Sequence, residues 1–329
     1  MRQFILDFPN QFKKGIEAAK NAKLKCEENY ENLIVCGMGG SALPAEILKT
    51  APCFTAPLFI HRSYGLPKEA SKKSLVFISS YSGNTEEAIS AFNAAAEKNL
   101  KIIGFGRGGK LEELCSKNNI FFVKYPFEAE NFQPRFALGM AFSAMLYAAH
   151  IFSFMPREPL EKLEEIKNIL KEKSGAREEE GKMLAEKISG KIVLIYAPYN
   201  FKALSYIWKI NFNETTKILA FANCYPELNH NEIAGFSGAE KTANCKIMVL
   251  NLLESGGDEK LLKRAEITAE VLKSKGFETI PIAVSDENYL EKYFSSIILS
   301  MWTSYYLALA RAADPTTEET IEDFKTKLR

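Results

Sequence analysis

The feature that most constrains the fold is a regular alternation of short apolar runs with longer stretches of helical spacing. In the first half of the chain, five such runs occupy residues 32–36, 57–61, 74–79, 101–105 and 120–123. Continuous apolar runs of this length are typical of parallel strands that are buried on both faces. We therefore predict an α/β domain, residues 1–155, with a five-stranded parallel sheet flanked by helices.

A second α/β domain is predicted for residues 156–329. It begins with a charge-rich stretch, residues 157–190, which we interpret as a solvated linker helix or pair of helices. Apolar runs then return at residues 191–197, 216–221, 246–251 and 279–284. We predict that this half repeats the first, again with a five-stranded sheet, since 329 residues are enough for two domains that each bury a core.

The charge balance argues against nucleic acid and acidic membranes as partners. The chain has 42 Lys and Arg against 41 Asp and Glu, a formal net charge of +1, so it has no excess of one sign to attract a polyanion. An anionic ligand must therefore be bound by a local site. The cysteines show no C-x-x-C pair, and we interpret all six as buried thiols of a cytoplasmic protein: Cys26, Cys36, Cys53, Cys115, Cys224 and Cys245.

Residues 136–155 test the interpretation as a cytoplasmic protein. They contain no Asp, Glu, Lys or Arg over a length that could cross a bilayer. The small residues and His150 in this segment fit a helix that is buried on all sides, at a domain or subunit interface. The N-terminus, with Asp7 and Pro9, lacks the unbroken apolar core of an export signal. We therefore predict a soluble protein that stays in the cytoplasm.

Two loops rich in glycine and hydroxyl groups follow apolar runs in the first half, GMGGSA at 37–42 and SYSGNT at 80–85. Each is predicted to open a helix, with Ser41 as a cap of the first and Asn84 and Glu87 as a capping box of the second. Backbone amides, hydroxyls and the positive end of a helix dipole then converge where a phosphate can bind. Ordinary tight turns and a dinucleotide site are the alternatives, although no acidic residue ends a following strand to hold a ribose.

Four segments make the sequence recognisable: GMGGSA, SSYSGNTEE, ENFQPRFALG and CYPELNHNEIAGF, in this order. With them the chain resembles the bifunctional phosphoglucose/phosphomannose isomerases, which are built from two tandem sugar-isomerase (SIS) domains. The resemblance runs from about Leu33 to the C-terminus. It implies a cofactor-free enzyme that interconverts glucose 6-phosphate with fructose 6-phosphate, with mannose 6-phosphate as a second substrate.

The resemblance also assigns roles to individual residues. It implies that the sugar phosphate is bound by Gly40, Ser41, Ser80, Ser82 and Thr85, and that the reaction uses Arg135, Glu214, His230 and Lys325. No metal ligand is implied. In the resembling family the histidine comes from the neighbouring subunit, so we expect a homodimer with the active site between domains and shared by two chains. The apolar segments 136–155 and 294–309 are predicted to supply its contacts.

These residue types suit the conversion of an aldose into a ketose. The sugar ring must open, a proton must leave C2, and a proton must return to C1 through an enediol. A partly buried carboxylate such as Glu214 can remove the C2 proton, and His230 can pass a proton during ring opening with Lys325 as its partner. Arg135 is always charged and can stabilise an enediolate oxygen without a metal.

The residues alone leave other interpretations open. Glu214 also fits an exposed acid near a helix start, and His230 fits a helix-capping or structural histidine. Rival residues exist for three roles: Glu227 and Glu232 for the base, Lys327 for the lysine, and Thr316, Thr317 or Thr320 for the threonine that the family associates with mannose 6-phosphate.

Two other functions compete with the isomerase. A zinc or iron isomerase is poorly supported, because His61, His150 and His230 show no H-x-H or H-E-x-x-H spacing. A sugar-phosphate-binding regulatory protein would keep the phosphate loops without the catalytic set. Arg135, Glu214 and His230 are all present and favour the enzyme.

Overall fold

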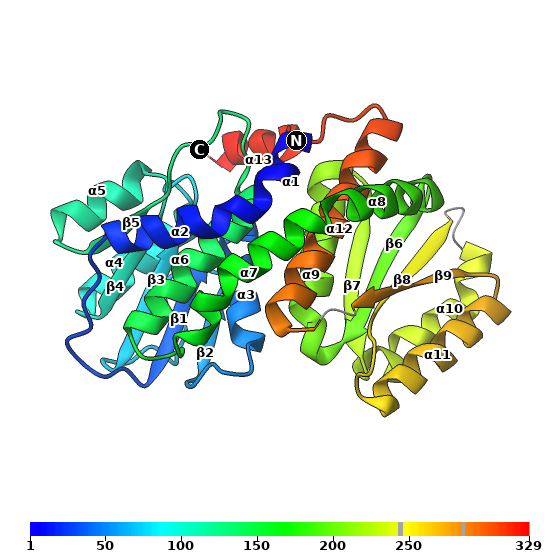
Figure 1. Ribbon diagram of the computed structural model, residues 1–329, viewed down its shortest axis with the longest axis horizontal. Coiled ribbons are helices and arrows are strands. Elements are labelled where there is room, and N and C mark those ends of the chain that lie inside the picture. Colours follow the sequence, from blue (N-terminus) through cyan, green and yellow to red (C-terminus); the bar gives the residue numbers. More distant parts are fainter. Residues whose placement is uncertain (243–245, 285–286, 329) are drawn as a thin grey trace. The chain divides into compact units, whose positions relative to one another are not determined.

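The computed structural model describes residues 1–242, 246–284 and 287–328 (Figure 1). The chain forms two compact units. The N-terminal unit is Leu6–Lys171, and the C-terminal unit combines Met1–Ile5 with Glu172–Arg329. The structure thus divides near residue 171, where the sequence analysis places the division after residue 155, because helix α7 (Glu158–Glu172) belongs with the N-terminal unit.

A five-stranded parallel sheet forms the centre of the N-terminal unit, as predicted. Its strands lie in the order β2-β1-β3-β4-β5, and all neighbouring pairs are parallel. The strands are β1 (Asn32–Gly37), β2 (Leu58–His61), β3 (Ser74–Ser79), β4 (Lys101–Gly106) and β5 (Phe121–Lys124). Each predicted apolar run agrees with its strand to within one residue at either end.

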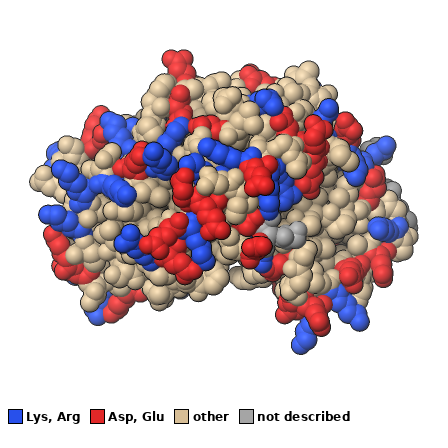
Figure 2. All heavy atoms as spheres, viewed as in Figure 1, with Lys and Arg blue, Asp and Glu red and all other residues tan. Residues whose placement is uncertain are grey.

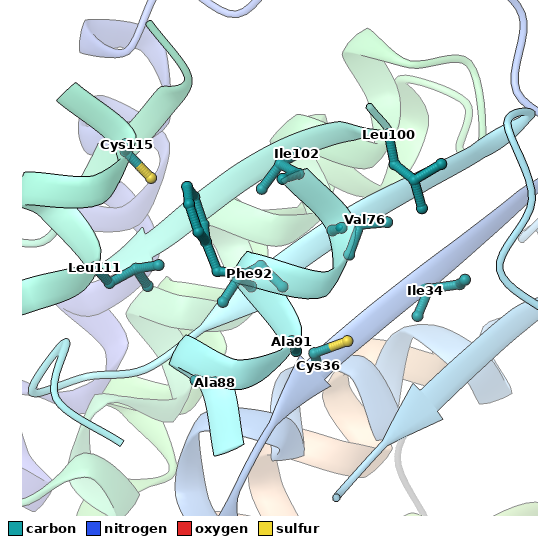
Figure 3. Packing of buried hydrophobic residues seen from close by; sticks show 12 residues of the cluster. Ile34, Cys36, Val76, Ala88, Ala91, Phe92, Leu100, Ile102, Leu111 and Cys115 are labelled. Atoms are coloured by element: carbon teal, nitrogen blue, oxygen red, sulfur yellow. The ribbon is translucent and has the colours of Figure 1, made fainter. Parts of the chain in front are cut away.

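Helices cover this sheet and explain why its strands are apolar throughout. The remaining helices of the unit are α2 (Gln11–Asn21), α3 (Leu43–Thr50), α4 (Glu86–Glu97), α5 (Gly109–Lys117) and α6 (Leu138–Ile151). On one face, Phe92 of α4 and Leu111 of α5 belong to a core with Val76 and Ile102 of the central strands (Figure 3). Side chains alternate along a strand, so Phe77, which is also fully buried, points to the opposite face.

Helix α6 corresponds to the charge-free segment 136–155. All its residues are buried except Tyr147, His150 and Ile151. It packs against α2 and α3 of its own unit, and the contact with α2 is so close that a Cβ on Gly15 would lie 2.0 Å from the carbonyl oxygen of Met140. The predicted burial is confirmed, and helices of the same unit contribute to it. Within the part of the chain that is described, no helix combines the length and the apolar character that spanning a membrane requires.

The C-terminal unit holds a second parallel sheet, in the order β7-β6-β8-β9. Its strands are β6 (Ile192–Pro198), β7 (Ala220–Tyr225), β8 (Ile247–Glu254) and β9 (Glu278–Val284). The prediction of a fifth strand was wrong for the residues that the structure describes. The chain enters α12 (Tyr289–Ala310) shortly after β9 ends, and this leaves too little chain for another crossover and strand.

Strand β7 also begins later than predicted, at Ala220 instead of residue 216. The apolar run starts while the preceding helix continues, because Phe212–Thr216 adds a π-helical turn to α9 (Lys202–Asn211). Lys217 then adopts a left-handed backbone conformation with φ of 57°, which ends the helix.

Helix α12 is the most apolar helix of the C-terminal unit and packs against α8 (Ser174–Ile188) and α9. Two buried hydrogen bonds fix its register: Trp208 Nε1 donates to Ser296 Oγ at 3.1 Å, and Asn211 Nδ2 donates to Ser300 Oγ at 2.7 Å. The apolar segment 294–309 therefore contacts helices of its own unit. The other helices here are α1 (Arg2–Asp7), which continues into the N-terminal unit, α10 (Glu232–Thr242), α11 (Glu259–Ser274) and α13 (Glu319–Leu328).

The surface agrees with the balanced charge of the sequence. On the face shown in Figure 2, acidic and basic side chains of the described residues are interspersed, and each sign occurs in small groups. This distribution fits the net charge of +1 and favours local binding sites over a broad electrostatic field.

Candidate functional site

The two predicted phosphate loops meet at the carboxyl ends of β1 and β3, which are neighbours in the sheet. Two hydrogen bonds join them: Ser79 Oγ donates to the carbonyl oxygen of Ser41 at 2.8 Å, and the backbone N–H of Tyr81 donates to Ser41 Oγ at 3.1 Å. The sequence predicted Ser41 as a helix cap, and this was wrong. Ser41 lies in a 3-10 turn, Gly39–Ala42, that precedes α3, and its hydroxyl instead fixes the second loop.

Within the loop 80–85, the hydroxyls differ in their surroundings. Ser80 is buried, and its Oγ accepts hydrogen bonds from the N–H of Gly83 at 3.1 Å and of Thr85 at 3.4 Å and lies 2.9 Å from Thr85 Oγ1. Ser82 is exposed, and its Oγ accepts from Asn84 N–H at 3.2 Å. Ser80 therefore organises the loop from inside, while Ser82 presents its hydroxyl at the surface.

A third segment, which the sequence analysis missed, supports this loop from behind. Arg107, directly after β4, donates its N–H to the carbonyl of Tyr81 at 2.9 Å, and Leu111 N–H donates to the carbonyl of Gly83 at 2.9 Å. The contact is so close that a Cβ on Gly83 would lie 1.7 Å from the carbonyl oxygen of Gly108. The sequence signal for this support is the glycine pair at 108–109, which follows the next strand along the sheet.

The same segment explains why the predicted capping box is absent. Asn84 Oδ1 accepts a hydrogen bond from Lys110 N–H at 3.0 Å, so it bonds across to the supporting segment. Thr85 occupies the N-cap position of α4, where no side chain caps the helix. The amides at the start of α4 therefore have no side-chain cap at this end of the loop.

Arg135 lies next to these loops in the N-terminal unit. It belongs to a 3-10 turn, Pro134–Ala137, and only 2% of its surface is exposed. Its guanidinium carbon is 4.4 Å from the ring centroid of Phe136. A Cβ on Gly40 would lie 2.9 Å from the backbone nitrogen of Arg135, so the first loop and the arginine are in direct contact and Gly40 leaves the space for it.

Glu214 lies in the π-helical turn that links α9 to β7 and is half-buried. The turn is ordered by Asn213 Oδ1, which accepts from Ala220 N–H at 2.8 Å. The ammonium group of Lys217 donates to the carbonyl oxygens of both Glu214 and Thr317. This lysine brings the Glu214 turn close to the backbone of the C-terminal threonine segment.

His230 ends a short 3-10 helix, Glu227–His230, and is exposed. Of the two rival carboxylates, Glu227 is exposed and accepts from Asn231 Nδ2 at 2.8 Å. Glu232 accepts hydrogen bonds on both oxygens, from Tyr196 OH at 2.5 Å and from Asn223 Nδ2. Burial and this hydrogen bond to Glu232 raise the pKa of Tyr196, which keeps its proton available for the carboxylate.

The two candidate lysines lie on α13, and both are exposed. Lys325 Nζ pairs with Glu322 at 2.6 Å and Lys327 Nζ with Asp323 at 2.6 Å. These pairs join residues of the same helix, three and four positions apart. They give the two lysines equivalent surroundings, so the geometry of α13 does not separate them.

Comparison with known proteins decides the family. A family described as "Bacterial phospho-glucose isomerase C-terminal SIS domain" matches residues 177–328. The chain is 30% identical over 303 residues to a bifunctional phosphoglucose/phosphomannose isomerase of Aquifex aeolicus, with 91% of each chain covered. The chain belongs to the bifunctional phosphoglucose/phosphomannose isomerase family. Another bifunctional phosphoglucose/phosphomannose isomerase, from Caldicellulosiruptor bescii, is 30% identical over 342 residues and covers 100% of this chain and 98% of its own.

Solved structures support the fold of this phosphoglucose/phosphomannose isomerase family member. A putative phosphosugar isomerase from Clostridium difficile 630 superposes with a TM-score of 0.74 at 13% identity and covers 100% of this chain and 97% of that chain. At this identity the likeness concerns the fold. With two parallel sheets and the SIS match at residues 177–328, the predicted tandem SIS architecture and the membership among isomerases are confirmed.

The residues that the resemblance assigned fall into two groups in this family member. The N-terminal unit brings together Gly40, Ser41, Ser80, Ser82, Thr85 and Arg135, joined by the contacts described above. The C-terminal unit holds Glu214, His230 and Lys325 on three different elements. No group of three or more His, Cys, Asp or Glu side chains in the described residues has the arrangement of a metal site.

The cysteine prediction was correct only in part. Cys36, Cys115 and Cys224 are buried, and burial raises the pKa of Cys36 and Cys115 to about 12, so these thiols are unreactive at neutral pH. Cys26 is exposed and Cys53 is half-buried, so the prediction of burial was wrong for these two, which lie in loops outside the sheets. Cys245 lies outside the described residues.

Proposed function

We propose that this protein interconverts glucose 6-phosphate and fructose 6-phosphate, and mannose 6-phosphate and fructose 6-phosphate, by ring opening and an enediol intermediate. The observation that carries the proposal is the junction of two hydroxyl-rich loops at Ser41, with the buried Arg135 packed against Gly40. The arginine whose backbone packs on the first loop carries a permanent positive charge, which can stabilise an enediolate. The relatives from Aquifex aeolicus and Caldicellulosiruptor bescii are bifunctional phosphoglucose/phosphomannose isomerases, and this supports the same reaction.

The phosphate site is proposed in the N-terminal unit because the corresponding position of the other sheet is already filled. In the C-terminal unit, the helix after β8 is α11, and Asp258 Oδ1 accepts from its first amides, Lys260 N–H at 2.8 Å and Leu261 N–H at 3.1 Å. A carboxylate there repels a phosphate and occupies its donors. At α4 the N-cap residue, Thr85, makes no such bond.

Glu214 is the proposed base for the C2 proton. Glu232 is a poor candidate, because both its oxygens already accept hydrogen bonds, from Tyr196 and from Asn223, and are engaged within the protein. Glu227 is exposed and accepts a hydrogen bond from Asn231 Nδ2, so it lies at the surface and is not enclosed as a base at a substrate site would be. Half-buried Glu214 combines access with partial desolvation, and this combination suits a base that works near neutral pH.

The remaining roles follow from charge and proton capacity. His230 is exposed at the end of its turn and can move a proton between the ring oxygen and O1 of the sugar. Lys325 is proposed as its partner in ring opening. Arg135 stabilises the oxygen that becomes negative in the enediolate, so the reaction as proposed requires no metal ion and no organic cofactor.

The same site can serve both aldoses. Glucose 6-phosphate and mannose 6-phosphate differ only in configuration at C2, and removing the C2 proton from either gives the same enediol. The face on which the proton returns then decides the product. We assign the threonine associated with mannose 6-phosphate to Thr317, because Lys217 joins its carbonyl to that of Glu214, whereas Thr316 Oγ1 already donates to Asp314 at 2.7 Å.

The protein is proposed to act as a cytoplasmic homodimer in which each site uses residues of both chains. Support for the dimer comes from the family resemblance alone. The apolar segments that the sequence analysis offered as contacts pack within their own units, in α6 and α12. Buried free thiols at Cys36 and Cys115 fit a reducing compartment. A non-catalytic sugar-phosphate sensor is not favoured, because the relatives that cover most of the chain are isomerases.

Product analysis tests the proposal directly. The purified protein is treated with EDTA, dialysed and incubated separately with fructose 6-phosphate and with mannose 6-phosphate. We expect both aldoses from the first and fructose 6-phosphate from the second, at rates that EDTA leaves unchanged. Conversion of glucose 6-phosphate alone would remove the mannose assignment. Loss of activity in EDTA with recovery on adding zinc or manganese would overturn the metal-free mechanism.

A further inference from the structure

Tyr81, the second residue of SYSGNT, has contacts that the phosphate-binding role of this loop does not explain. Its backbone joins two neighbouring segments, because its N–H donates to Ser41 Oγ at 3.1 Å and its carbonyl accepts from Arg107 N–H at 2.9 Å. The residue is 7% exposed, and its ring lies against two further rings. The ring of Tyr125 is 6.4 Å away at an interplanar angle of 27°, and that of Phe132 is 6.1 Å away at 38°.

These ring contacts continue to Arg135. Phe132 packs edge-on against Phe136 with centroids 6.0 Å apart, and the guanidinium carbon of Arg135 is 4.4 Å from the Phe136 centroid. Tyr81, Phe132, Phe136 and Arg135 therefore form one continuous series of contacts within the N-terminal unit. The series begins in the phosphate loop and ends at the Arg135 guanidinium, the charge that the proposed function uses to stabilise the enediolate.

The segment that precedes Arg135 has little regular structure. Residues 125–133, between β5 and the turn that carries Arg135, contain neither helix nor strand. A backbone hydrogen bond from Tyr125 N–H to the carbonyl of Gly106 at 2.8 Å holds its start, and side-chain packing adds to this. Phe132 and Tyr125 in this segment both pack on the Tyr81 ring, so this ring is a common reference point for the loop and for the arginine segment.

We infer that Tyr81 is a positioning residue for the isomerisation, whose ring sets the distance between the phosphate cradle and the Arg135 guanidinium through Phe132 and Phe136. The inference rests on the proposed function. A sugar phosphate is fixed at one end by the cradle, so a shift of the arginine relative to the loop displaces the charge from the enediolate oxygen. A displacement of about 1 Å can reduce turnover by roughly 100-fold without loss of the binding contacts.

The ring is the active part of this side chain. Burial raises the pKa of Tyr81 to about 12, so the hydroxyl is neutral at neutral pH. Tyr81→Phe keeps the ring and its stacking contacts, and we expect wild-type kinetics from it. Tyr81→Leu keeps apolar volume and removes the stacking, and we expect kcat to fall by about 10- to 100-fold. The dissociation constant of glucitol 6-phosphate, an open-chain analogue that cannot isomerise, should stay within about twofold of wild type in both variants.

A double-mutant cycle distinguishes positioning from general damage. If Tyr81 acts through the arginine, Tyr81→Leu should cost less than about threefold in an Arg135→Lys background, because the geometry it maintains is already lost. Phe92→Leu is the matched control, since it makes the same aromatic-to-leucine change in the core cluster on α4. It should lower the melting temperature and leave kcat unchanged at assay temperatures well below melting.

The outcomes separate this inference from the proposed function. A wild-type protein that converts neither fructose 6-phosphate nor mannose 6-phosphate overturns both. If the wild-type protein is active, any of three results overturns the inference alone. The first is an unchanged kcat in Tyr81→Leu, and the second is a kcat that Tyr81→Leu lowers equally in the wild-type and Arg135→Lys backgrounds. The third is a loss of glucitol 6-phosphate binding in Tyr81→Leu as large as its loss of kcat. If Tyr81→Leu does not fold, Phe132→Leu interrupts the same series at its second ring, and a normal kcat in that variant is decisive against the inference.

Discussion

The hydroxyl of Ser82 and the carboxylate of Glu214 have different tasks in the proposed reaction, and substitution separates them. Ser82→Ala removes one exposed hydroxyl and should weaken sugar-phosphate binding by roughly 1 to 3 kcal/mol with little change in kcat. Glu214→Gln keeps the shape and removes the base, so kcat should fall by several orders of magnitude while affinity for glucitol 6-phosphate stays nearly intact. Steady-state kinetics and calorimetric titration measure the two effects.

Glu227→Gln is the matched control for the base, since Glu227 is exposed and bonds only to its neighbour Asn231 among the contacts described. We expect its kcat to stay within about twofold of wild type. Near-normal turnover in Glu214→Gln together with a large loss in Glu227→Gln would transfer the role of base to the second carboxylate.

At this scale the sequence predicts which residue types gather at the site but not which atoms they bond. Ser41 and Asn84 were recognised as polar groups at helix starts, and both do lie there. Their bonds go elsewhere, because Ser41 Oγ accepts from Tyr81 N–H and Asn84 Oδ1 accepts from Lys110 N–H. Capping rules describe local partners, whereas these partners lie in segments that follow other strands, Tyr81 after β3 and Lys110 in α5 after β4. The contact between Gly40 and Arg135 has no local signal for the same reason.

Among the elements, the phosphate loop depends on one glycine. Gly83 has φ of 73°, and a Cβ there would lie 1.7 Å from the carbonyl oxygen of Gly108. Gly83→Ala should therefore lower the free energy of unfolding by about 2 to 4 kcal/mol, or force the loop away from its support and abolish phosphate binding. Urea unfolding and titration with glucitol 6-phosphate measure both quantities.

Gly175→Ala is the control for this substitution, because a Cβ at Gly175 in α8 meets no atom within 4 Å. It should leave stability within about 0.5 kcal/mol of wild type or raise it. A Gly83→Ala protein that matched the control in both stability and binding would contradict the tight support described for this loop.

The N-terminal helix is attached to the C-terminal unit by a pH-dependent cluster. Arg2 Nε donates to Glu178 Oε1 at 2.9 Å, and Tyr306 OH donates to the same oxygen at 2.7 Å. Burial acts to raise the pKa of Glu178, but these hydrogen bonds outweigh it and hold the pKa below its ordinary value. The carboxylate therefore contributes stability at pH values above its unfolded pKa, and this contribution disappears as the pH falls through the lowered folded pKa.

Melting curves of wild type and Glu178→Gln test this attachment. The variant should melt at a lower temperature at pH 7, and the gap should narrow and close as the pH falls through the lowered pKa of Glu178, where the wild-type carboxyl group also becomes uncharged. Glu179→Gln, an exposed neighbour on the same helix, should follow wild type throughout. A gap that persists unchanged at acid pH would show that Glu178 acts through packing and not through its charge.

Strand positions were predictable wherever an apolar run coincided with a strand, as in all five strands of the first sheet. The prediction was less accurate at β7, because the predicted run begins at Thr216, the last residue of a π-helical turn, and the strand begins only at Ala220. Helix and strand compete for such a run, and the packing of α9 against β6, β7 and α12 decides the result. The assumed fifth strand of the second sheet was wrong because it rested on repetition, without an apolar run of its own.

For the whole molecule, the tandem organisation was evident from the sequence, but the reason given for a dimer was not sound. An apolar helix is exposed or buried according to what packs on it, and α6 and α12 find partners inside their own units. Hydrophobicity alone does not distinguish a subunit interface from a core helix. The dimer therefore needs a test that does not depend on surface composition.

Complementation between inactive variants provides that test. If each site takes His230 from one chain and Glu214 from the other, neither Glu214→Gln nor His230→Ala is active by itself. When the two proteins are dissociated and reassembled together in equal amounts, about half of the dimers should be mixed, each with one intact and one doubly altered site. Roughly a quarter of wild-type activity should then return, since half of the dimers have one of two sites working.

Native mass spectrometry verifies mixing, and reassembly of either variant with itself is the control. Mixed dimers without activity would place both residues of a site in the same chain and remove the shared-site proposal, while the isomerase assignment would stand.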